Sequence, residues 1–255
     1  MAKQRTSLKR AFVKTSFLAL LLSLTIPING QDSQEKLMFS GSLTANTNGI
    51  ATIPAFTLDK PAIVGILGLK IKKFSVDQYI AYSTQGKPWY FESYFNYDWI
   101  DSGRLSFTTT AMWGVTYTYG RELIEGTSQE TMDYQRYVFL IPSISHKFGP
   151  NRSITLTTQH GYGFPEGSIK WATFITLVGN IEHIPMGKSL YTSFYPQLLS
   201  TNFDWKTDGF FLAGKFGIGH KDLPFFLYTR FSHFIDGNIV PDPGFKWNIG
   251  ITYNF

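Results

Sequence analysis

Apolar and polar residues alternate one by one along most of the chain after its first thirty residues. Residues 104–120 show this best, because Phe107, Trp113 and Val115 share one parity with other apolar or aromatic side chains, while Thr and Gly dominate the other. Residues 89–99 and 210–219 repeat the same period of two. Successive side chains of a strand point to opposite faces, so the pattern predicts amphipathic strands rather than helices.

Turn residues divide this pattern into about twelve segments of strand length. We predict strands at residues 37–46, 61–71, 74–84, 89–99, 104–120, 134–147, 152–162, 169–182, 189–200, 208–219, 225–234 and 245–255. Every second connection is short, whereas the longest ones, residues 47–60, 121–133 and 235–244, belong to the other set. Short periplasmic turns and longer extracellular loops are typical of an antiparallel transmembrane β-barrel, so the predicted fold class is all-β with one such barrel.

A soluble β-sandwich would also show alternation, but its strands average about 5–6 residues. Many of the segments here are ten residues or longer. Aromatic residues also lie near the predicted strand ends, as the girdles of a membrane barrel require. They are Trp89, Tyr97, Trp99, Tyr117, Tyr119, Tyr162, Trp171, Trp247 and Tyr253. Both features favour the barrel over the sandwich.

Residues 1–30 differ in composition from the rest of the chain. Their basic residues are Lys3, Arg5, Lys9, Arg10 and Lys14, and no acidic residue precedes Asp32. An apolar run at residues 17–26 follows, and then Pro27 and Gly30. This order predicts a secretory signal peptide that is cleaved near Gly30. The alternative, a retained anchor helix, would need an apolar run of about 20 residues. The predicted domains are therefore a signal peptide, 1–30, and a barrel, 31–255, with a short lead at 31–36.

Composition supports an exported membrane protein. The chain has no Cys, which excludes a lipoprotein anchor, disulfides and thiolate metal sites. Charged residues make up 16% and aromatic residues 17%, whereas soluble domains have about 25% charged residues. Five of the 23 Lys and Arg lie in residues 1–30, leaving 18 basic and 18 acidic residues in the remainder. The basic excess belongs to the export signal and gives no argument for a nucleic-acid partner.

The C-terminal strand carries a specific motif. One face holds Phe245, Trp247, Ile249, Ile251, Tyr253 and Phe255. An ordinary edge strand could end in this way, but the segment resembles the C-terminal signal of bacterial outer-membrane proteins, with Tyr two residues before a terminal Phe. The resemblance implies that the barrel-assembly machinery of a Gram-negative outer membrane reads Tyr253 and Phe255 as an assembly signal. Residues 54–62 and 86–89 are similar to uncharacterised porin-like proteins of the Bacteroidetes type, a resemblance that implies no substrate.

The sequence gives little support for catalysis. Residues 233–238 come closest to the His-x-Ser-Asn pattern of barrel lipases, but Ile235 and Asp236 replace the Ser and the Asn. Ser232 and Ser145 each directly precede a His, and adjacent residues of a strand point to opposite faces. No two His residues have a strand spacing of two. We predict no catalytic residue, no metal site and no cofactor. The acidic segment 121–133 is expected to be a solvated extracellular loop, with cation or partner binding as the alternative.

The polar face of the strands favours a channel. The side chains expected to line its pore are Asp77, Glu92, Asn96, Asp98, Gln159, Lys170, Glu182, Lys215 and Arg230. Such a wall suits a water-filled pore in which fixed charges set ion preference. The leading hypothesis is an outer-membrane porin-like channel for small polar solutes, in contact with membrane lipid. The alternatives are a lipid-modifying enzyme and a closed structural or adhesive barrel that acts through its loops.

Overall fold

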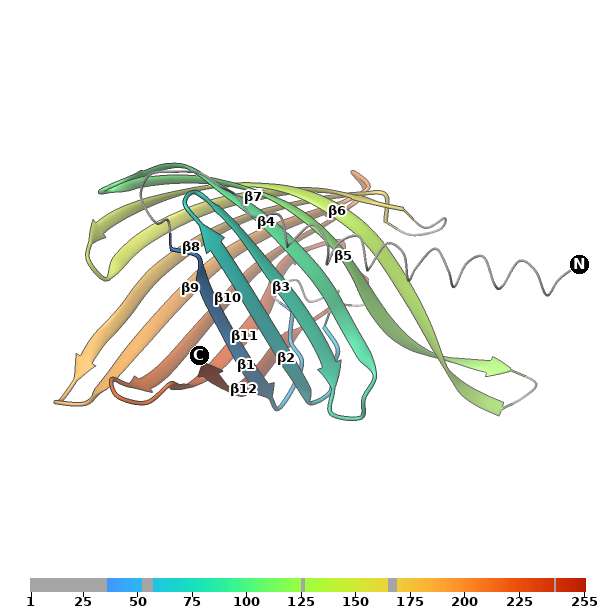
Figure 1. The fold of residues 1–255 in the computed structure, drawn as a ribbon. Coiled ribbons are helices and arrows are strands. Elements are labelled where there is room, and N and C mark those ends of the chain that lie inside the picture. The colour runs from blue at the N-terminus through green and yellow to red at the C-terminus, as the bar shows by residue number, and fades with distance from the viewer. Residues whose placement is uncertain (1–35, 52–56, 125–126, 165–168, 241) are drawn as a thin grey trace, which may run out of the picture. The chain divides into compact units, whose positions relative to one another are not determined.

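Twelve antiparallel strands form a closed barrel in the computed structural model (Figure 1). The strands are β1 (Met38–Asn46), β2 (Ala62–Ile71), β3 (Phe74–Ser83), β4 (Pro88–Ser102), β5 (Leu105–Ile124), β6 (Thr127–Gly149), β7 (Arg152–Gly163), β8 (Trp171–Met186), β9 (Leu190–Phe203), β10 (Thr207–His220), β11 (Phe225–Gly237) and β12 (Phe245–Asn254). Each strand pairs with the next along the chain, and β1 pairs with β12. The predicted fold class is confirmed.

The structure describes residues 36–51, 57–124, 127–164, 169–240 and 242–255. The whole barrel lies within residues 36–255. The predicted signal peptide, 1–30, lies outside the described residues. Within the described ranges, no helix is long and apolar enough to cross a membrane.

The alternation of the sequence separates the two faces of the barrel wall. Leu43, Ile63 and Leu67 point outward and are exposed, whereas Ala62 and Val64, their neighbours in β2, are buried inside. The same division continues around the ring, so the outer wall is largely apolar. Closure pairs the edge strands β1 and β12, which removes the unpaired backbone groups that an open sheet would leave.

The connections follow the predicted asymmetry, with one correction. Short connections join the strands at 72–73, 103–104, 150–151, 187–189 and 221–224, and the β1–β2 connection, 47–61, is long as expected. The prediction of a loop at 121–133 was wrong. Strands β5 and β6 continue as a paired hairpin through this segment, with Arg121 opposite Glu130 and Ile124 opposite Thr127. In Figure 1 this hairpin extends beyond the other strands. Polar residues stand at both parities of this segment, so alternation could not reveal the pairing.

Trp89 is a second correction. The β3–β4 register shifts at this point, because Ala81 pairs with Tyr90 and Tyr82 pairs with Pro88. Trp89 is the extra residue of a bulge. Its side chain is 3% exposed and packs with Ala81 and other small residues inside the wall. The expectation that Trp89 belongs to an outer aromatic girdle was therefore wrong.

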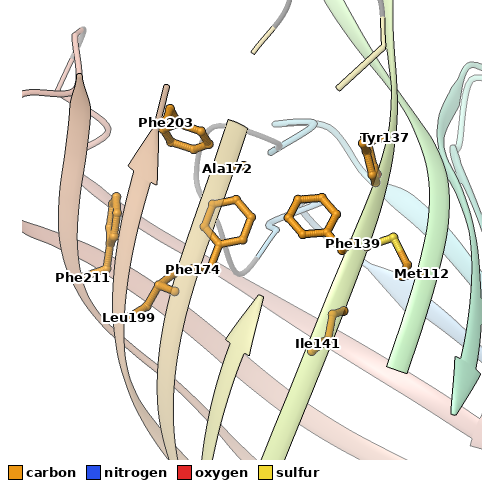
Figure 2. Close-up of a cluster of buried hydrophobic side chains, with 9 residues drawn as sticks. All are labelled: Met112, Tyr137, Phe139, Ile141, Ala172, Phe174, Leu199, Phe203 and Phe211. Atoms are coloured by element: carbon orange, nitrogen blue, oxygen red, sulfur yellow. The ribbon is translucent and has the colours of Figure 1, made fainter. Parts of the chain in front are cut away.

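A second cluster of apolar side chains lies on the inner faces of β5 to β10 (Figure 2). Its buried members are Met112, Tyr137, Phe139, Ile141, Ala172, Phe174, Leu199, Phe203 and Phe211. Phe139 and Phe174 point toward one another from β6 and β8, with ring centroids 5.6 Å apart (Figure 2). The Phe174 ring also makes an edge contact with the Phe203 ring, with centroids 5.6 Å apart. The inside of this barrel is therefore partly filled by aromatic rings.

Candidate functional site

A cavity of about 310 Å³ lies inside the barrel. Side chains of β3 to β8 and of β11 line it, together with two residues of the β1–β2 connection. The lining residues are Ile50, Ala51, Tyr79, Trp89, Tyr90, Glu92, Tyr94, Met112, Thr116, Tyr137, Phe139, Gln159, Phe174 and Arg230. Because β11 lies five strands from β4 around the ring in one direction and seven in the other, the cavity crosses the interior rather than following one wall.

Glu92 is the acidic group of this cavity. Its two carboxyl oxygens accept hydrogen bonds from the hydroxyls of Tyr94 and Tyr137, each at 2.7 Å. Tyr137 lies on β6 and reaches Glu92 on β4 over Gly114, which pairs with both residues in the intervening strand. A β-carbon at Gly114 would lie 2.8 Å from the Tyr137 ring and 2.9 Å from Cγ of Glu92. The glycine is therefore what allows the bond to form across β5.

The aromatic wall is built in the same way. Gly161 on β7 lies between Phe139 and Ala172 in the register, and a side chain there would overlap the Phe139 ring. Without one, Phe139 crosses β7 and stacks on Phe174, with an interplanar angle of 24°. Stacked rings at this separation are attractive beyond the area that they bury. Glycines at inward positions thus let large side chains of alternate strands meet.

The basic group of the cavity is on β11, and a second basic side chain lies next to it on β10. Arg230 lines the cavity, and Lys215 is its direct partner in the β10–β11 ladder, so both side chains lie on the inner face. The Lys215 ammonium lies 4.3 Å from the centre of the Tyr228 ring and 5.1 Å from that of Phe226. Within the described residues, neither basic side chain forms an ion pair or a hydrogen bond with an acid. Arg230 and Glu92 line the same cavity without pairing to each other.

A separate polar network lies closer to the short connections. Asn96 donates to Asp77 at 2.8 Å and accepts from Thr110 at 2.6 Å. Asp98 accepts from Lys70 at 2.9 Å and from Thr108 at 2.8 Å. These groups hydrogen-bond between adjacent strands on the inner face. They therefore stabilise the pairing of the strands and also make the inner surface polar.

The predicted pore-lining residues are therefore not all at one site. Glu92, Gln159 and Arg230 line the cavity, with Lys215 beside it, whereas Asp77, Asn96 and Asp98 form the polar network. Two of the nine lie elsewhere. Lys170 directly precedes β8 and donates to the carbonyl of Phe164, and Glu182 lies near the opposite end of β8, where its amide donates to Asn151.

Sequence reasoning missed most of the apolar lining. Tyr137 and Phe139 alternate with Val138 and Leu140, so both faces of β6 are apolar and the pattern does not tell which one faces inward. The missed residues are Ile50, Trp89, Met112, Tyr137, Phe139 and Phe174. A usable signal was present in Gly114 and Gly161, because inward glycines mark places where a neighbouring side chain crosses the strand.

The β1–β2 connection reaches from the barrel wall to the cavity. Ile50 is 4% exposed and lines the cavity. Asp59 forms an ion pair with Lys246 of β12 at 2.9 Å, and Lys60 forms one with Glu130 of the β5–β6 hairpin at 3.1 Å. Adjacent residues of this connection thus form ion pairs with strands that lie far apart around the ring. Glu130 also pairs with Lys87.

The C-terminal residues complete the closure of the barrel. The amide of Phe255 donates to the carbonyl of Gly41, and the Gly41 amide donates to the Phe255 carbonyl, both at 2.9 Å. The rings of Tyr253 and Phe255 stack on the outer face with centroids 5.9 Å apart. Their role as an assembly signal stays a prediction.

The histidines do not form a catalytic group with their neighbouring serines. Ser232 is buried on the inner face while His233 is exposed, as expected for adjacent residues of a strand. Among the residues that the structure describes, no group of three His, Asp or Glu side chains is placed to hold a metal ion.

The fold of this chain is similar to solved structures of closed outer-membrane barrels. The KdgM porin in complex with disordered oligogalacturonate has a TM-score of 0.52 and 8% identity over 85% of this chain and 99% of that chain. The KdgM porin alone gives a TM-score of 0.51 and 8% identity over the same shares. An outer-membrane channel from Pseudomonas putida F1 has a TM-score of 0.47 and 8% identity, covering 90% of this chain and 98% of that one. No protein-family model matches the chain, and no curated protein matches its sequence.

Proposed function

We propose that this protein is an outer-membrane barrel that acts as a porin-like channel for small polar solutes. The observation that carries the proposal is the cavity that crosses the inside of the closed barrel between Glu92 and Arg230. Fixed charges beside a solvated path are what a selective pore uses. The likeness of the fold to the KdgM porin supports the same class.

The outer-membrane location rests on physical grounds that are independent of that likeness. Only helices and closed barrels satisfy all backbone groups inside lipid. The exposed outer face carries large apolar side chains around the ring, among them Leu67, Trp113 and Leu140. In water, such a surface would be a strong aggregation risk. The signal peptide predicted at residues 1–30 is consistent with export.

A closed structural barrel is the second candidate. The apolar cluster around Phe139 and Phe174 favours it, because these side chains fill part of the interior. The two candidates differ in whether ions cross the barrel. The cavity between Glu92 and Arg230 favours the channel.

Single-channel conductance in a planar bilayer tests the proposal. The chain is produced in full, purified from the outer membrane and checked for folding by its heat-dependent mobility on gels. We expect stable conductance steps that change when Glu92→Gln or Arg230→Gln is introduced. Arg152→Gln, at the start of β7 and away from the cavity, serves as the matched control. A correctly folded barrel that carries no current would contradict the channel and favour the closed barrel.

A further inference from the structure

We propose that the interior cavity is a binding site for a small aromatic carboxylate, with its anionic group at Arg230 and its ring against Phe139 and Phe174. The inference deepens the proposed channel function and rests on it, since it names the class of solute that the channel selects.

The first step is the uncompensated positive charge on one side of the cavity. Lys215 and Arg230 are directly opposite each other in the β10–β11 ladder and face the same way. Like charges in directly opposed positions of a sheet destabilise it. The Lys215 ammonium lies over the rings of Tyr228, Phe226 and Tyr195 and forms no ion pair with a described acid. Glu182 reaches this cluster only through its hydrogen bond with Tyr195. An anion bound next to both groups would offset their repulsion.

Glu92 does not supply this anion. Both of its oxygens already accept a hydrogen bond, one from Tyr94 and one from Tyr137. It lies on the wall that faces Arg230 across the cavity, and no ion pair joins the two. With both oxygens occupied, Glu92 offers no partner to a second carboxylate, whereas the Arg230 guanidinium does. The two groups thus define an orientation for the bound molecule.

The second step is the apolar part of the cavity. Phe139 and Phe174 stack to form one wall, and Met112 and Trp89 line the cavity as well. An aromatic ring gains from face and edge contacts with such side chains and from sulfur contacts with Met112. Of the polar lining groups, Thr116 already donates to the Trp89 carbonyl at 3.3 Å. Glu92, Tyr94 and Tyr137 also hydrogen-bond to one another, so part of the polar lining is already occupied. A flat ring needs no such partners, whereas each hydroxyl of a sugar does.

Size limits the ligand further. The cavity volume is about 310 Å³, whereas a cavity of about 150 Å³ accommodates benzene. The space suits one ring that carries a short acidic side chain. It is too small for an oligosaccharide or a peptide in a single bound position.

Phenylacetate is the probe that tests the site, measured by isothermal titration calorimetry on the full-length protein purified from the membrane. Two analogues separate the contributions, because phenylethanol keeps the ring without the charge and glucuronate keeps the carboxylate on a sugar ring. We expect saturable binding of phenylacetate, with each analogue weaker by roughly tenfold or more. Arg230→Gln should lower the affinity for phenylacetate by roughly 10- to 100-fold, and Arg230→Lys should lower it less. Arg152→Gln should leave the affinity unchanged.

The proposal is overturned if phenylacetate does not saturate the site, if glucuronate binds as well, or if folded Arg230→Gln and Arg230→Lys both bind like the wild type. Conductance is recorded on the same samples, so the two proposals can fail separately. Binding without current would keep the site and reject the channel, whereas current without binding would keep the channel and reject the site.

Discussion

Replacement of Gly114 by Ala tests the central contact of the cavity. A β-carbon there would lie 2.8 Å from the Tyr137 ring and 2.9 Å from Cγ of Glu92, whereas carbon atoms prefer separations of about 3.5–4.0 Å. The two side chains must therefore move by roughly 0.6 Å or more. Such a movement stretches the 2.7 Å bond between Tyr137 and Glu92 beyond the usual O–H···O range of about 2.5–3.0 Å.

The expected free-energy change combines three contributions. Overpacking costs about 1–3 kcal/mol, and a hydrogen bond to a charged group stabilises by about 1.5–3 kcal/mol. Alanine in a strand is better than glycine by about 0.5–1 kcal/mol, which offsets part of the loss. The first two costs do not add in full, because moving the side chains apart relieves the strain at the expense of the hydrogen bond. We therefore expect Gly114→Ala to lower the free energy of unfolding by about 2–4 kcal/mol.

Guanidinium unfolding of the folded barrel, followed by tryptophan fluorescence, measures this change. With a slope of about 2–6 kcal/mol per molar, the midpoint should fall by roughly 0.3–2 M. Gly65→Ala is the matched control, because its β-carbon would have its nearest neighbour at 3.9 Å. It should be neutral or stabilising by up to about 1 kcal/mol.

A double-mutant cycle separates the proposed cause from a general intolerance of β5 to substitution. In a Tyr137→Ala background, the cost of Gly114→Ala should fall, since the ring and its bond to Glu92 are gone and only the contact with Cγ of Glu92 remains. The reasoning is refuted if Gly114→Ala unfolds at the same midpoint as Gly65→Ala, or if its full cost persists without the Tyr137 ring.

Two further predictions concern the aromatic cluster and the β5–β6 hairpin. Phe174→Ala should lower the free energy of unfolding by about 3–5 kcal/mol because it opens a void in a buried cluster. Phe148, which is 69% exposed, is its control, and equal losses from the two substitutions would argue against a packed interior. Glu130→Gln should release Lys60 and speed hydrogen exchange in the β1–β2 connection, and high salt should do the same for the wild type because it screens exposed ion pairs. Asp133→Asn should leave hydrogen exchange unchanged. If it speeds exchange as much as Glu130→Gln does, the effect is not specific to the Lys60–Glu130 ion pair.

Much of the fold follows from local patterns in the chain. Alternation places strands such as 104–120 within a few residues of their observed bounds, and the short connections follow from the same pattern. Besides the ambiguous faces of β6, the alternation misleads at Trp89 and at residues 121–133. At Trp89, one extra residue in β4 turns the side chain inward, and this depends on the register with β3. At 121–133, polar residues stand at both parities of the sequence, so nothing in the pattern distinguishes a hairpin from a loop.

The candidate site, too, follows partly from the local pattern and partly from the tertiary structure. The parity of the strands already places Glu92, Gln159 and Arg230 on the inner face. Which of these meet is a matter of ring closure, because β4, β7 and β11 face each other only when β1 pairs with β12.

The sequence by itself therefore determined the strands, their two faces and the inward charges, because period and turn chemistry act over a few neighbouring residues. Only the tertiary structure decided the rest. The bond from Tyr137 to Glu92 over Gly114, and the lack of an ion pair between Lys215 or Arg230 and any described acid, depend on register and closure. Those are properties of paired strands, and no single segment of the chain contains them.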